Sequence, residues 1–292
     1  MKQQKLFVKK PKHILQNKKT NVYFLFMLPS ILGVLIFIFI PFLDVIIKSF
    51  FNVTNGEFVG LKNYINILLN EAFKLASFNT IKFIFICIPL LVSMSLIVAI
   101  LLNNITFKQN FFKTTFLVPM AIPVASVSLL WNITFNNKGA INGILNNYDI
   151  SSINWLNSNF AFWILVFTYI WRNLGYNIVL WLAGLSNISK SLYEASSVDG
   201  ANKRQLFIFI TLPNLIPTVF TVSVLSLLNS FKVFREAYLI AGEYPHSSMY
   251  MLQHIFNNWF MSLDIDKLSA GATILSVVIF VLILMLQKRL GE

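Results

Sequence analysis

Charged residues are scarce in this sequence: they make up 12% of its 292 residues, against roughly 25% in soluble domains. Hydrophobic residues make up 57%, and the mean hydropathy is +0.70. A chain this apolar needs a bilayer as its solvent. The single cysteine, Cys87, excludes an internal disulfide and any cysteine-rich metal site.

Motifs for catalysis and for nucleotide binding are also missing. The sequence has no G-x-x-x-x-G-K-[ST] loop to cradle ATP phosphates, and no H-E-x-x-H, C-x-x-C or G-x-S-x-G. Its three histidines offer no complete ligand set for a metal. We expect no acidic residue deep in an apolar segment, where a carboxylate proton relay would need one. The sequence therefore predicts no catalytic residue, no metal site and no cofactor bound by this chain.

Long apolar stretches are what the sequence does contain. Six of them can cross the hydrocarbon core as helices, which takes about 20 residues each. They are residues 22–43, 83–102, 114–135, 160–185, 206–231 and 268–286. The first follows a lysine-rich segment, but it is too long for a signal peptide and lacks a small-residue cleavage site, so we expect it to be retained. The predicted fold class is an all-α polytopic membrane protein with six transmembrane helices.

The positive charges predict the orientation of these helices. If the N-terminus is cytoplasmic, the inner segments hold about twice as many Lys and Arg residues as the outer ones, as the positive-inside rule requires. The net charge of +12 is then a topology signal, and no nucleic-acid partner is expected. We predict a basic cytoplasmic segment at 1–21, a six-helix domain at 22–292 and a cytoplasmic C-terminus, in a bacterial cytoplasmic membrane.

The inner segment at 186–213 is unusually polar for this chain. Ser191 and Glu194 have the spacing of a capping box, in which each side chain satisfies the other residue's backbone N–H. Gly200 can take the left-handed conformation that ends a helix, and a second helix can start at Ala201. The pattern predicts a helix–glycine–helix elbow on the cytoplasmic side.

The order of residues in this elbow resembles the EAA loop of ABC-importer permeases. The family pattern is E-A-A, three residues, G, nine residues and I-x-L-P. Here it is carried by Glu194, Ala195, Ser196, Gly200, Ile210, Leu212 and Pro213. Ser196 is the one departure, and it exchanges one small residue for another. With Asp199 and Ala201 added, the form is similar to that of the carbohydrate importers.

The resemblance extends over nearly the whole chain after about residue 20. Further segments similar to maltose-type, lactose-type and glycerol-phosphate-type permeases lie at 58–64, 79–80, 119–131, 139–142, 155–156, 182–185, 230–238 and 244–245. The resemblance implies that this chain is the first of the two permease subunits of a heterodimer, with six helices and no additional domain.

The resemblance also implies partners. A second permease would complete the path, an ABC ATPase dimer would use ATP-Mg, and an extracytoplasmic binding protein would deliver the solute. The elbow would be the coupling helix, in which Glu194 pairs with a basic residue of the ATPase. Gly200 would keep the shape of the elbow, and Ala195 and Ser196 would make the closest contact. This chain would contact membrane lipid and would have no ATPase site of its own.

Candidate residues of the solute path combine amides and hydroxyls with aromatic faces, as sugar recognition requires. They are Asn229, Ser230, Phe231, Lys232 and Phe234 near the fifth span, Asn132 in the third, and Trp171, Arg172, Tyr176 and Asn177 in the fourth. The alternatives are lipid contact for the aromatic residues and interhelical hydrogen bonds for the asparagines. Arg172 is an intramembrane charge, which faces a cavity, pairs with a partner or snorkels to the interface.

Three other functions stay open from the sequence. A permease for another polar solute, such as glycerol-3-phosphate or a polyamine, would share the elbow. A secondary transporter would need intramembrane carboxylates or an internal repeat. A membrane scaffold would have no use for the EAA register.

Overall fold

The computed structural model describes residues 26–103, 105 and 109–290. This part of the chain is helical and contains no strand, only an isolated bridge between Phe51 and Phe58. The predicted all-α class is confirmed. The predicted basic segment at 1–21, and the predicted start of the first span at residue 22, lie outside the described residues.

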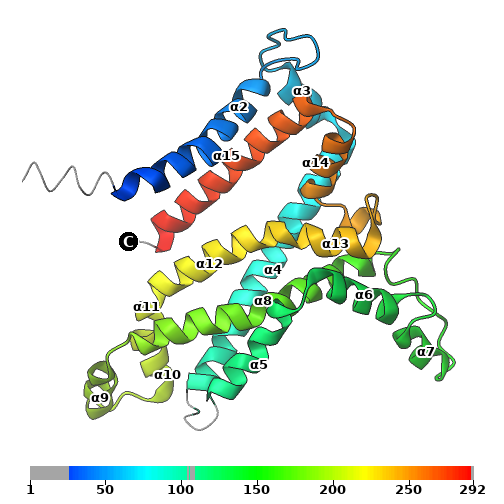
Figure 1. Cartoon of the computed structure of the whole chain (residues 1–292). Helices are drawn as coiled ribbons and strands as arrows, with labels where there is room; N and C mark the ends of the chain where they lie inside the picture. Colours follow the sequence, from blue (N-terminus) through cyan, green and yellow to red (C-terminus); the bar gives the residue numbers. More distant parts are fainter. Residues whose placement is uncertain (1–25, 104, 106–108, 291–292) are drawn as a thin grey trace, which may run out of the picture.

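The first and last long helices lie side by side (Figure 1). The first runs from Phe26 to Lys48 and includes a π-helical turn, Leu35–Phe39, before α2 (Ile40–Lys48). Its partner is α15 (Ile265–Leu290). The short helices α3 (Lys62–Leu69) and α14 (Leu252–Met261) pack against the N-terminal part of α15.

Helix α8 (Phe160–Ser186) is the centre of the bundle, packed against α4 (Glu71–Asn103), α5 (Gln109–Ala121) and α12 (Ile216–Ser230). Polar bonds fix these contacts within the apolar core. The indole of Trp181 donates to Ser95 Oγ of α4 over 2.9 Å, and the Tyr169 hydroxyl donates to the carbonyl of Ser226 over 2.6 Å. Because lipid offers no competing partners, such bonds help to hold membrane helices together.

Two glycines let other helices approach α8 closely. A methyl group at Gly175 would collide with the backbone carbonyl of Phe116 in α5. One at Gly184 would collide with Thr218 in α12. Small residues at such crossings allow membrane helices to pack backbone against backbone.

The predicted third span, 114–135, is not one helix. Helix α5 ends at Ala121 and α6 (Val124–Phe135) begins after Pro123, and the chain turns by 85° at this break. Pro123 has no N–H to continue the helix, and its ring forces the residue before it away from helical geometry. Helix α7 (Ala140–Asn146) follows α6 at the edge of the molecule (Figure 1).

The predicted fifth span, 206–231, also has different bounds. After α10 (Lys203–Gln205), the chain forms a π-helical turn, Leu206–Thr211, and α11 (Leu212–Asn214), and then breaks at Leu215. An apolar helical segment then runs from Ile216 to Ala241 through α12, a 3₁₀ turn, Phe231–Val233, and α13 (Phe234–Ala241).

The extension through α13 places Glu236 inside the protein. This carboxylate was expected in an outer loop, yet it is buried in a long apolar helical segment. Glu236 lies near the C-terminal end of this segment, five residues before Ala241, and the absence of an acidic residue deep in a span stays a prediction.

By length and composition, four described helices could cross a membrane, or five if the bent pair α5–α6 counts as one span. They include α4 and α15, each longer than predicted. Helix α8 has 27 residues, but Arg172, Asn173 and Asn177 lower its hydropathy at mid-length. Six crossings and cytoplasmic termini stay predictions.

Candidate functional site

A cavity of about 350 Å³ lies where the α5–α6 break, the middle of α8 and the α12–α13 junction meet. Its size is at the lower end of the range for small-molecule sites. Pro123 and Val124 bring the start of α6 to its wall, since the chain turns there. The polar residues that line the cavity come from α8 and from the segment 229–236.

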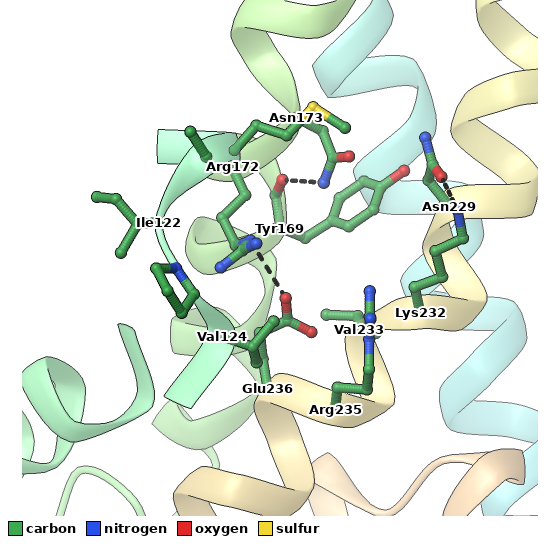
Figure 2. Close-up of a pocket in the computed structure, with 13 residues that line it drawn as sticks. Ile122, Val124, Tyr169, Arg172, Asn173, Asn229, Lys232, Val233, Arg235 and Glu236 are labelled. Carbon is green, nitrogen blue, oxygen red and sulfur yellow. Dashed lines mark hydrogen bonds and ion pairs between the residues drawn. The ribbon is translucent and has the colours of Figure 1, made fainter. Parts of the chain in front are cut away.

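An ion pair crosses this cavity (Figure 2). Arg172 Nε of α8 lies 3.2 Å from Glu236 Oε1 of α13, and the two side chains are 12% and 7% exposed. Arg172 Nη1 and Glu236 Oε2 are buried and have no hydrogen-bond partner in the described part of the chain. Buried charges normally need full pairing, so this pair links α8 to α13 with part of its bonding capacity unused.

Amides beside the ion pair are oriented by the protein itself. Asn173 Nδ2 donates to the carbonyl of Tyr169 over 2.8 Å, so that its Oδ1 can accept a further bond. Lys232 Nζ donates to Asn229 Oδ1 over 2.9 Å, so that the Asn229 Nδ2 group can donate. Asn173 Oδ1 and Asn229 Nδ2 form no hydrogen bond within the described residues, and both residues line the cavity (Figure 2).

Three of the ten candidate path residues line this cavity: Arg172, Asn229 and Lys232. Two others bond within the bundle. Asn177 Nδ2 donates to Ser226 Oγ over 2.9 Å between α8 and α12, and Ser230 Oγ donates to the carbonyl of Leu227 over 2.6 Å.

The remaining candidates lie elsewhere. Trp171 packs edge-on against Trp131, 5.7 Å between ring centroids, and Phe234 packs against His254. Phe231 lines a separate apolar groove between α4, α14 and α15. Asn132 and Tyr176 are half-buried and do not line the cavity. Their place on the solute path stays a prediction.

Sequence reasoning missed Tyr169, Asn173, Arg235 and Glu236 as cavity residues. The signal for Glu236 was helical spacing. Asn229, Lys232, Val233 and Glu236 follow the i, i+3, i+4, i+7 pattern of one helix face, which becomes visible only if the fifth span continues past 231.

The elbow follows the C-terminal end of α8 at Ser186, away from the cavity at the middle of that helix. Helix α9 (Lys190–Val198) begins one residue before Ser191, so the predicted capping box of Ser191 with Glu194 is wrong. Ser189 is the N-cap residue, and its hydroxyl bonds to that of Ser191 over 2.7 Å. The capping box forms instead at the second helix, which starts at Lys203: Asn202 Oδ1 accepts from the Gln205 N–H, and Gln205 Oε1 accepts from the Asn202 N–H.

Gly200 has the predicted left-handed conformation, with φ of +82°. The Ala201 N–H donates to the carbonyl of Ser196 over 3.0 Å, and the Gly200 N–H donates to that of Ser197 over 3.1 Å. These two bonds form a Schellman motif, which satisfies the last carbonyls of α9 and reverses the chain.

The elbow is attached to the bundle and open to a partner. The Tyr193 hydroxyl bonds to Thr211 Oγ1 over 2.9 Å, which joins α9 to the π-helical turn. Glu194 and Asp199 are exposed, and Glu194 has no ion pair within the described residues. Val198 of the same helix is 88% exposed.

The sequence pattern of the family described as binding-protein-dependent transport system inner membrane component matches residues 83–291. The chain belongs to this family. As an inner membrane component with several apolar helices, it is a multi-pass protein of the cytoplasmic membrane.

Named relatives agree with this assignment. The chain is 35% identical over 230 residues to the arabinooligosaccharides transport system permease protein AraP of Bacillus subtilis, covering 77% of this chain and 73% of that protein. It is 29% identical over 276 residues to the trehalose/maltose transport system permease protein MalF of Thermococcus litoralis, covering 92% of each.

A solved structure has the same fold. It is a bacterial alginate ABC transporter in complex with an alginate pentasaccharide-bound periplasmic protein, and one of its chains superposes with a TM-score of 0.80. The match covers 95% of this chain and 96% of that one at 21% identity. At this identity, the likeness shows the shared fold alone.

Proposed function

We propose that this chain is the permease subunit of an ATP-driven carbohydrate importer and forms, with a second permease, the path of a sugar or oligosaccharide. An extracytoplasmic binding protein would deliver the solute. The observation that carries the proposal is the elbow at 186–213, where Gly200 joins two short helices in the register of the EAA loop. The sugar-transport permeases among its relatives support the substrate class.

The geometry of the elbow suits a lever. Closure of an ATPase dimer would pull on α9, and the bond between Tyr193 and Thr211 would pass that movement to the π-helical turn at the base of α12. Helices α8 and α12 would then rock as rigid bodies between inward-open and outward-open states. The exposed Glu194 and Val198 would be buried against the ATPase.

The energy source would lie in the partner subunits. The relatives are permease subunits of transport systems, and this chain would have no ATPase site or enzyme activity of its own. ATP-Mg would bind to the ATPase dimer, beneath the elbow. Glu194, Ala195, Ser196, Asp199, Gly200, Ala201, Leu212 and Pro213 are the residues that we assign to the coupling contact.

The cavity at Arg172 would form this subunit's share of the solute path. Helix α12 begins after the break at Leu215 that follows the elbow and ends at Ser230 beside the cavity, so a movement of the elbow that α12 follows would reach the cavity wall at Asn229. The free amide groups of Asn173 and Asn229 suit sugar hydroxyls.

One other solute class is favoured by a specific observation. Arg172, Lys232 and Arg235 give the cavity a cationic lining, which suits glycerol-3-phosphate and opposes a polyamine. Calorimetric screening of the binding protein that serves this importer would test the proposal, using oligosaccharides, phosphodiesters and polyamines. We expect an oligosaccharide to bind. Binding of a phosphodiester or a polyamine alone would contradict the substrate class.

A further inference from the structure

The charges that line the cavity do not balance. Arg172, Lys232 and Arg235 are cationic, and Glu236 is the one acidic residue among the lining residues. Glu236 already pairs with Arg172 at 3.2 Å. Neither of the other two cations forms an ion pair within the described residues, so the lining of the cavity carries an excess of positive charge.

The two remaining cations are placed for a ligand. Lys232 Nζ is held by the neutral amide of Asn229, which orients the ammonium group and leaves its charge intact. Arg235, one turn further along the chain, has no ion pair within the described residues. Both side chains are exposed, so a solute in the cavity can reach them.

The backbone adds to this positive potential. Because the chain turns by 85° after Ala121, α6 starts at the cavity wall, with Pro123 and Val124 among the lining residues. The first N–H groups of a helix have no acceptor within it and carry a partial positive charge. In transporters with broken helices, such starts face the anionic groups of substrates.

A carboxylate in the cavity would be attracted by both Lys232 and Arg235, and a neutral sugar would not. We propose that the cavity selects saccharides that carry a carboxylate, as oligosaccharides of uronic acids do. The carboxylate binds between Lys232 and Arg235, and the free amide groups of Asn173 and Asn229 bond to ring hydroxyls. The inference rests on the proposed function, because it takes the cavity as part of the solute path.

The test compares an acid with its uncharged counterpart. The complete importer is purified without its binding protein and titrated at equilibrium with digalacturonate, with the dimethyl ester of digalacturonate and with glycerol-3-phosphate. We expect the acid to bind about tenfold more tightly than the ester, the value of one charge-assisted hydrogen bond. The preference should fall to below about threefold when Lys232→Gln and Arg235→Gln are combined. The control Lys138→Gln removes an exposed cation between α6 and α7 and should leave the preference unchanged.

The outcomes separate the inference from the proposed function. Equal binding of acid and ester, or a preference that survives the double substitution, would overturn the inference and leave carbohydrate import standing. Binding of glycerol-3-phosphate with no binding of either saccharide would overturn both. Gel filtration and ATP hydrolysis by the variant importer would establish that the double variant is assembled before its affinities are compared.

Discussion

Arg172 and Glu236 form a buried ion pair, with 3.2 Å between Nε and Oε1, that joins the central helix α8 to α13. Breaking one side of such a pair leaves an uncompensated charge. We predict that Glu236→Gln lowers the free energy of unfolding by about 3 kcal/mol, as measured by thermal unfolding in detergent.

The double variant Arg172→Met with Glu236→Leu is the control for this prediction. It removes both charges and replaces them with side chains of similar volume, which is often neutral for stability. We expect it to be more stable than Glu236→Gln alone. If the double variant loses as much stability as Arg172→Met and Glu236→Leu lose separately when added together, the two residues are not coupled.

Gly175 lets α5 and α8 touch through their backbones. In Gly175→Ala, the added methyl group would collide with the carbonyl of Phe116, which cannot rotate away as a side chain can. We predict a loss of about 1–3 kcal/mol, typical of overpacking, read from the midpoint of thermal unfolding. Gly143→Ala in α7 is the matched control, because a methyl group there meets nothing within 4 Å. Equal effects of the two substitutions would contradict the packing argument.

The sequence predicted the elbow well because the bonds that shape it join residues of the same short segment. Gly200 ends α9 through bonds to residues only three and five positions earlier, and the EAA register lies within the same segment. The capping residues were misplaced, and the second helix begins at Lys203 instead of Ala201. Ser189 precedes Ser191 closely, and either serine could cap the helix, so the spacing alone could not choose between them.

The cavity was harder to predict because it depends on contacts between distant segments. The apolar stretch continues through Pro123, so the sequence predicted one span over 114–135 where the chain turns by 85°. Glu236 looked like a loop residue because its neighbours Arg235 and Tyr238 are polar. Its burial depends on Arg172, which lies in another helix and which no local pattern connects to it.

His254 predicts a pH dependence of stability. The ring is fully buried in α14 between Phe234 and Tyr250, and its Nδ1 accepts the Met251 N–H over 3.1 Å. Burial lowers the pKa of His254 from 6.5 to about 4. As the pH falls from about 6.5 towards 4, the unfolded chain therefore binds a proton at His254 that the folded chain does not bind. Stability is complete above that window and should fall within it by about 1.4 kcal/mol per pH unit.

His254→Asn tests this origin. The asparagine Oδ1 can still accept the Met251 N–H, but it does not titrate. Unfolding midpoints measured at pH 7.5 and pH 5 should differ less in the variant than in the original chain. An unchanged difference would assign the pH dependence to other groups.

A substitution at Gly200 of the elbow should separate ATP hydrolysis from transport. At φ of +82°, a β-branched side chain is strained, so Gly200→Val should distort the turn between α9 and α10. We expect the assembled importer to retain ATP hydrolysis and to lose at least about tenfold in uptake, which corresponds to about 1.4 kcal/mol of coupling. Gly200→Asn is the control, because asparagine tolerates the left-handed conformation and should keep uptake near the original rate.

Uptake into proteoliposomes tests the central claim most directly. The importer is reconstituted from this chain, its partner permease and the ATPase, and a labelled oligosaccharide is supplied with the binding protein. Carbohydrate import by an ABC system predicts accumulation only when ATP-Mg reaches the ATPase side, with no response to an imposed ion gradient. Accumulation driven by an ion gradient without ATP would contradict it.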